Sequence, residues 1–309
     1  MISIKKDFSG NCSNMQKRST FWNMVSGIIN ASQSTIMIFF VIRISGTYDT
    51  GILSIAFAIS YLMFTIGLYG IRNYQVTDTN NKFLFKDYLG TRIFTIIFML
   101  LISSIYILSK AYSIDKTIII FSFCVIRMID ALEDVFHGLY QKKGKLDIAG
   151  KALSIRLVLC TICFILFYYA SKDLVITSIS TTIFSFIIFL IINNSILPNF
   201  IKLEYNFDIH KIKSLLISCF PLFLASFLSI YISNAPKYAI DNTLSEDVQA
   251  YFGILFTPVY IIKLFSSFIY RPQLTIMANE WYKTRNSKFF SMVIKQLFAI
   301  ILITLSIML

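Results

Sequence analysis

Five ionisable side chains lie within one apolar stretch, residues 117–140, that is otherwise suited to span a membrane. The five are Arg127, Asp130, Glu133, Asp134 and His137. At about 100° per residue they fall within an arc of roughly 120°, so a helix here has one polar face. Each charge placed in mid-membrane costs about 2.5–3.5 kcal/mol. We therefore expect this face to turn away from lipid, toward protein or water.

This polar stripe has two interpretations. In the first, it is an internal lock in which Arg127 pairs with Asp130 or Asp134 at helical spacing and His137 satisfies Glu133. In the second, it lines a water-filled cavity, where Arg127 binds an anion and the carboxylates or His137 bind or relay a coupling cation. Three acids on a single arginine leave a net negative charge, which favours the cavity.

Other polar residues in apolar stretches are further candidates for a cavity. Lys263 lies deep within residues 250–270 and should face the protein interior. Asn30 and Gln33 occupy the middle of residues 21–44 and are candidates for cavity lining. Arg72, near the end of another apolar stretch, is expected to be an interfacial anchor.

The usual constellations of enzymes and metal sites are missing from the sequence. It has only two histidines, and it lacks HExxH, Walker and dinucleotide-binding patterns. Cys160 and Cys163 form a CxxC pair, but they lie among Leu, Ile and Phe and are expected to be buried, unreactive cysteines. We predict no enzyme activity, no metal and no cofactor.

The elements that must position these residues are membrane-spanning helices. Hydrophobic residues make up 56% of the 309 positions, charged residues 14%, and mean hydropathy is +0.71. Apolar stretches of about 20 residues predict nine spans. Their approximate ranges are 21–44, 50–70, 90–109, 117–140, 152–170, 174–197, 214–232, 250–270 and 290–309. The predicted fold class is an all-α integral membrane protein.

The distribution of basic residues predicts the orientation. With a cytoplasmic N-terminus, 21 Lys and Arg residues flank the spans on the inside, among them Arg72, Arg92 and Arg156, and five flank them on the outside. This is a strong positive-inside signal, expected of the cytoplasmic membrane. It also accounts for the net charge of +12 without a nucleic-acid partner, through topology and attraction to anionic membrane lipids.

The spans fall into two groups. Residues 1–198 are expected to form a six-helix N-terminal lobe, residues 199–213 a cytoplasmic linker, and residues 214–309 a partial second lobe of about three helices. Two spans contain a proline, and Asn234-Ala235-Pro236 is expected to close the seventh span. The chain ends within an apolar run, so we expect that the second lobe is cut short.

Several segments resemble a known family. They are YGIRNYQVTD (69–78), IDALEDVFHGLYQ (129–141), NAPKYAID (234–241) and YFGILFTP (251–258). They are similar to the polysaccharide-transporter branch of the multidrug/oligosaccharidyl-lipid/polysaccharide flippase superfamily. The resemblance implies two six-helix lobes that move undecaprenyl-pyrophosphate-linked sugar units across the cytoplasmic membrane by alternating access. It also implies that Arg127 and Lys263 contact the substrate, with Asp130, Glu133 and Asp134 as partners for a coupling ion or sugar hydroxyls.

Three functions follow as hypotheses. The first is a flippase for lipid-linked oligosaccharide, with a polysaccharide polymerase and glycosyltransferases as further partners. The second is a cation-coupled exporter of small molecules or drugs on the same fold, favoured if the acids dominate binding. The third is a non-transporting, truncated remnant.

Overall fold

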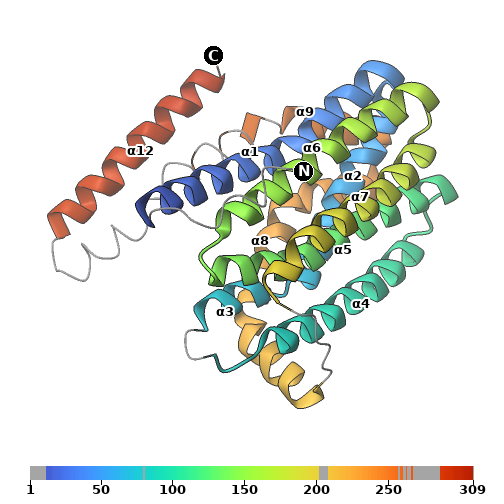
Figure 1. Ribbon diagram of the computed structural model, residues 1–309. Helices are drawn as coiled ribbons and strands as arrows, with labels where there is room; N and C mark the ends of the chain where they lie inside the picture. Colours follow the sequence, from blue (N-terminus) through green and yellow to red (C-terminus); the bar gives the residue numbers. More distant parts are fainter. Residues whose placement is uncertain are drawn as a thin grey trace. The chain divides into compact units, whose positions relative to one another are not determined.

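The computed structural model describes residues 12–78, 81–201, 208–256 and 286–308, and between the last two ranges positions 258, 259, 262 and 266. Within these ranges all regular structure is helical, and the predicted all-α class is confirmed (Figure 1). The elements are α1 Cys12–Ser45, α2 Thr47–Leu68, α3 Ile71–Thr77, α4 Phe85–Ser109, α5 Ile114–Lys142, α6 Leu146–Ser171, α7 Leu174–Ile196, η1 Leu197–Asn199, α8 Ile209–Thr243, α9 Glu246–Leu255 and α12 Asn286–Met308. Residues Met1–Tyr251 form one compact unit and Phe252–Leu309 a second.

Eight of the nine predicted spans correspond to long helices. Seven of the described helices are long and apolar enough to cross a membrane. The eighth, α5, has 29 residues, which is also sufficient, but its charged stripe lowers its hydropathy. The remaining predicted span, 250–270, lies mostly outside the described residues. The protein is therefore a multi-pass membrane protein.

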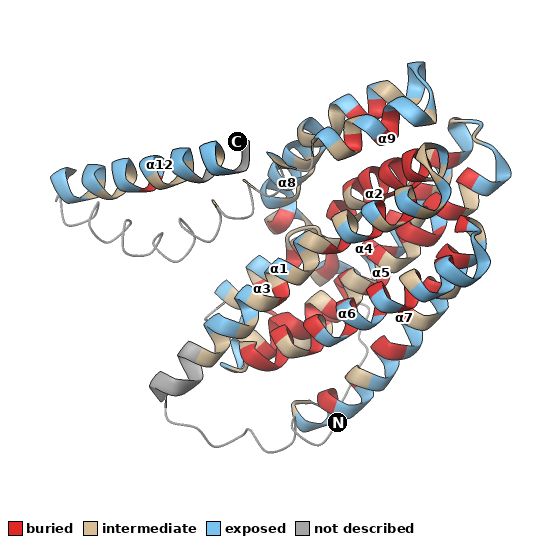
Figure 2. Cartoon of the chain, turned by 90° about the horizontal axis from the view of Figure 1, so that it is seen from above, coloured by how far each residue is buried: buried red, intermediate tan, exposed pale blue. Residues whose placement is uncertain are grey.

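The first unit is built around α2 and α5. Every residue of α2 from Thr50 to Ser60 is buried, and Figure 2 shows α2 buried over most of its length. This helix packs against α1, α4, α5 and α8, while α5 also contacts α3, α4, α6 and α7. Small residues such as Gly51, Ser54 and Ala58 let neighbouring helices approach closely, as is common between helices in membranes.

A sharp joint separates α2 from α3. Tyr69 and Gly70 both have left-handed backbone conformations, with φ of 46° and 70°. A side chain at Gly70 would in addition bring its Cβ to 2.8 Å from that of Leu222 in α8. The joint turns α3 across the end of α5, where a Cβ on Gly138 would meet the amide of Gln75 at 2.2 Å. A short, closely packed helix thus covers this end of the bundle.

Helix α8 is longer than predicted. The expected end of the seventh span at Asn234-Ala235-Pro236 is wrong, because α8 continues through Pro236 to Thr243. A proline inside a helix removes one backbone hydrogen bond. Contacts to α2 hold the turn that follows: Lys237 Nζ donates to Ser54 Oγ at 3.1 Å, and Tyr238 donates to the Ala58 carbonyl at 3.0 Å. The division into two lobes with a linker at 199–213 stays a prediction.

A polar cluster, which we call the Lys116 cluster, links the beginning of α5 to the end of α8 and the beginning of α9. Lys116 Nζ lies 2.6 Å from Asp241 Oδ1 and 2.7 Å from Glu246 Oε1, and Tyr112 donates a hydrogen bond to Asp241. Lys116 and Asp241 are almost fully shielded from solvent. This cluster lies at the end of the unit opposite to α3.

Candidate functional site

The polar face of α5 is turned inward, as its cost in lipid requires. Arg127, Glu133 and His137 are 2%, 1% and 4% exposed. The Asp130 and Asp134 side chains are 8% and 18% exposed, so only Asp134 has substantial access to solvent. The stripe therefore contacts other helices, and these supply its partners.

Four of the charged side chains form an ion-paired quartet. Arg127 Nη1 lies 2.5 Å from Asp130 Oδ2, and the Arg127 guanidinium lies 4.1 Å from the centre of the Tyr61 ring on α2. Arg156, from α6, lies 2.5 Å from Asp130 and 2.7 Å from Glu133. Arg127, Arg156, Asp130 and Glu133, which we call the quartet, thus contain two positive and two negative charges in mutual contact.

A second group forms around Asp134. Its Oδ1 lies 3.1 Å from Arg72 Nη1 of α3, and its Oδ2 lies 2.8 Å from Arg92 Nη2 of α4. Arg92 is fully buried and also donates to the Gly67 carbonyl at 2.5 Å. Arg72, Arg92 and Asp134, which we call the triad, contain two positive charges and one negative charge.

His137 is close to Glu133 but is not bonded to it. His137 Nε2 and Glu133 Oε1 lie 3.4 Å apart, and neither atom makes a hydrogen bond within the described part of the chain. The hydroxyl of the neighbouring Tyr140 is also buried and makes no hydrogen bond to any residue that the structure describes. Buried polar atoms of this kind usually find a partner. The predicted pairing of His137 with Glu133 is therefore present as a contact within ion-pair distance, without a hydrogen bond.

Sequence reasoning missed the arginines that neutralise the stripe. Arg92 and Arg156 were counted among basic residues flanking the spans, yet they are 0% and 1% exposed, and Arg72 reaches Asp134 in addition to lying near a helix end. The argument that three acids share one arginine is consequently wrong, because four arginines surround them. The available signal was the position of Arg92 and Arg156 inside their predicted spans.

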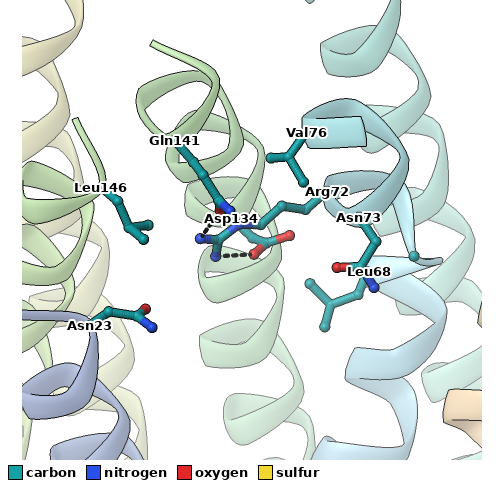
Figure 3. Close-up of a pocket in the computed structure, with 9 residues that line it drawn as sticks. Asn23, Leu68, Arg72, Asn73, Val76, Asp134, Gln141 and Leu146 are labelled. Atoms are coloured by element: carbon teal, nitrogen blue, oxygen red, sulfur yellow. Dashed lines mark hydrogen bonds and ion pairs between the residues drawn. The ribbon is translucent and has the colours of Figure 1, made fainter. Parts of the chain in front are cut away.

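A cavity of about 310 Å³ opens beside the triad (Figure 3). Its polar lining consists of Asn23, Arg72, Asn73, Asp134 and Gln141, and its apolar lining includes Leu68, Val76 and Leu146. Arg72 contacts both Asp134 and Gln141, since its Nη1 donates to Asp134 Oδ1 at 3.1 Å and its Nη2 donates to Gln141 Oε1 at 2.9 Å. The cavity is at the end of the unit where α2 and α5 end and α6 begins.

The structure brings together only some of the predicted site residues. Of the stripe, Asp134 lines this cavity, whereas Arg127, Asp130, Glu133 and His137 do not. Gln33 is buried and Asn30 half-buried on α1, and neither lines the cavity. Lys263 lies outside the described residues. A substrate-binding role for these side chains stays a prediction.

The cysteines behave as expected from their apolar surroundings. Cys160 and Cys163 are buried, free thiols. Among the residues that the structure describes, no group of three or more His, Cys, Asp or Glu side chains is placed to hold a metal ion. The prediction of no metal and no cofactor is left as a prediction.

Comparison with known proteins finds one informative similarity. No protein-family model matches the chain, and no solved structure matches it. The chain is similar to the capsular polysaccharide biosynthesis protein CapF of Staphylococcus aureus, with 26% identity over 240 residues, which is 77% of this chain and 59% of CapF. A match over that share of the chain necessarily includes α5 and its charged stripe. The chain thus spans less than two thirds of the length of this curated relative.

Proposed function

We propose that the chain is a membrane protein of polysaccharide biosynthesis that translocates lipid-linked oligosaccharide across the cytoplasmic membrane. The observation that carries this proposal is the buried quartet inside a membrane bundle, together with the triad at one end of it, in a chain similar to CapF. The substrate would be an undecaprenyl-pyrophosphate-linked repeat unit. The N-terminus would be cytoplasmic, which places the cavity beside the triad at the cytoplasmic end.

The energetics of the quartet support a function beyond holding helices together. Burying ions costs several kcal/mol each, and apolar side chains of the same volume often stabilise a core at least as well. A membrane bundle with three buried arginines, Arg92, Arg127 and Arg156, therefore has a polar interior at a cost in stability. We infer that this interior accommodates a charged, hydrated ligand or the path that it takes.

Alternating access supplies the mechanism, without covalent chemistry. The Lys116 cluster would close the outer end of the unit in the state seen here, while the cavity beside the triad is open at the other end. A ligand shifts such an equilibrium only by its difference in affinity for the two states. Translocation therefore requires that the contacts of the Lys116 cluster break when the outer side opens.

A cation-coupled exporter is the alternative. It would require Asp130, Glu133 or Asp134 to be available to a cation or a cationic drug. Each of these carboxylates instead lies within 3.1 Å of an arginine nitrogen. This pairing favours the flippase over the exporter.

Deletion of the gene in the organism that encodes it tests the proposal. We expect lipid-linked oligosaccharide to accumulate and surface polysaccharide to fall, and expression of the chain to restore both. Arg127→Ala should fail to restore export at a normal membrane level, whereas Arg43→Ala, at an exposed position on α1, should restore it. Unchanged surface polysaccharide in the deletion strain contradicts the proposal. Increased retention of a lipophilic cationic dye, with normal polysaccharide, supports the exporter instead.

A further inference from the structure

The charges on α5 are balanced in one group and unbalanced in the other. The quartet is neutral, because two arginines face two carboxylates. The triad has a net charge of +1, since Asp134 is shared between Arg72 and Arg92. The excess positive charge is therefore located at the triad.

Of the two arginines that share Asp134, Arg72 is the one that solvent reaches, and it lines the cavity. The Arg92 side chain is 0% exposed, whereas those of Arg72 and Asp134 are 27% and 18% exposed. Arg92 approaches Asp134 more closely than Arg72 does, at 2.8 Å against 3.1 Å. One carboxylate is thus shared by two guanidinium groups, and that of Arg72 is the accessible one at the cavity wall.

The rest of the cavity suits a small polar ligand. Asn23, Asn73 and Gln141 supply side-chain amides, each with two N–H donors. In Figure 3, Asn23 reaches the cavity from α1, on the side away from Arg72, while Asn73 extends from α3 beside it. A volume of about 310 Å³ is at the small end of ligand sites, which run from roughly 300 to 1,000 Å³. Such a cavity holds a headgroup and not a whole oligosaccharide.

We propose that this cavity is a binding site for one phosphate-type oxyanion, with Arg72 as its charge partner and the Asn23, Asn73 and Gln141 amides as hydrogen-bond donors. Planar guanidinium groups bind phosphate oxygens through paired, charge-assisted hydrogen bonds. The site lies wholly within the first unit and is argued from charge and shape, so it does not depend on the proposed transport. Its ligand is either the phosphate of a membrane lipid headgroup or the diphosphate of a substrate.

Two substitutions at the triad change its charge in opposite directions, which makes the test sharp. Arg72→Gln lowers the net charge from +1 to 0, and Asp134→Asn raises it to +2. An anion site must respond with opposite signs to these two changes. A site for a cation, or for neutral hydroxyl groups held by Asp134, must instead lose affinity in Asp134→Asn.

The experiment uses the full chain in nanodiscs of neutral lipid. Binding of inorganic pyrophosphate is measured by calorimetry, and retention of a short-chain phosphatidylglycerol by native mass spectrometry. We expect Arg72→Gln to weaken binding by about tenfold or more, the value of a charged hydrogen bond, and Asp134→Asn to strengthen it. Lys82→Gln is the matched control, because it removes one positive charge at an exposed position near the same end and should leave affinity unchanged.

The outcomes separate the ligand sources and can overturn the proposal. Binding of pyrophosphate alone identifies a substrate diphosphate, and binding of the lipid alone identifies a headgroup. The proposal is overturned if neither probe binds, if Arg72→Gln behaves like Lys82→Gln, or if Asp134→Asn weakens binding. If Asp134→Asn does not fold, Asn73→Ala replaces it: the proposal requires a severalfold loss, and an unchanged affinity overturns it.

Discussion

Removal of Arg156 should destabilise the bundle more than removal of any exposed basic residue. Arg156 is 1% exposed and lies within 2.7 Å of both Asp130 and Glu133. Replacing it with Met leaves the quartet with one positive and two negative charges. Asp130 keeps Arg127 as a partner, but among the described residues Glu133 keeps only His137, at 3.4 Å.

The expected loss is about 3–5 kcal/mol in the free energy of unfolding, the usual effect of breaking a buried ion pair from one side. The double variant Arg156→Met with Glu133→Gln returns the quartet to neutrality. It should therefore recover roughly 1–3 kcal/mol relative to the sum of the single changes, the size of coupling seen between residues in contact. Arg43→Met, at an exposed position of α1, is the control and should change stability by at most about 0.5 kcal/mol.

The assay is unfolding of the purified protein in mixed micelles, with the folded fraction followed by circular dichroism as the denaturing detergent increases. A double-mutant cycle over Arg156 and Glu133 gives their coupling directly. The reasoning is refuted if Arg156→Met is no worse than Arg43→Met, or if the two changes in the quartet are simply additive.

Three other substitutions test the packing and the polar contacts at the ends of the first unit. Gly51→Ala places a methyl group 2.0 Å from the Glu246 carbonyl oxygen and should cost about 1–3 kcal/mol in the same unfolding assay. Gly27→Ala, with no atom within 4 Å of its new Cβ, should be neutral or slightly stabilising. Lys116→Met leaves two nearby carboxylates without their cation and should lower the thermal midpoint, unless the Lys116 cluster is unimportant for stability, in which case the midpoint stays unchanged. The pKa of Asp78 is lowered because, although desolvation opposes the shift, two backbone N–H groups of the following loop stabilise its carboxylate. The contribution of the Asp78 carboxylate to folding stability is therefore full above the unfolded pKa of about 4 and is lost as pH drops through the lower folded pKa. Asp78→Asn should remove this part of the pH dependence of stability. A variant whose stability has the same pH profile as the unchanged protein would contradict the assignment.

Much of the architecture could be predicted because hydropathy over about 20 residues reports directly on membrane spans. The stripe on α5 could also be predicted from the sequence, since helical spacing alone places Arg127, Asp130 and Glu133 on one face. The partners of the stripe could not be predicted, because Arg92 and Arg156 come from α4 and α6. Both lie near the ends of predicted spans, where basic residues usually reflect the positive-inside rule. Pairing between helices depends on rotation and depth, which hydropathy does not define.

The end of α8 shows a second limit of local signals. Asn234-Ala235-Pro236 is a reasonable place to end a span, because proline cannot donate its backbone hydrogen bond. Contacts made after the proline, from Lys237 and Tyr238 to α2, keep the helix intact to Thr243. Tertiary contacts that begin beyond a helix-breaking residue leave no trace in the local sequence.

Translocation by the purified chain in liposomes tests the central claim most directly. A labelled polyprenyl-pyrophosphate oligosaccharide is placed in both leaflets, and a membrane-impermeant enzyme that cleaves the sugar is added outside. We predict that the protected inner fraction becomes accessible much faster with the chain than in protein-free liposomes. Equal protection in the two preparations, with the protein shown to be folded, would contradict the proposal that this chain moves lipid-linked oligosaccharide.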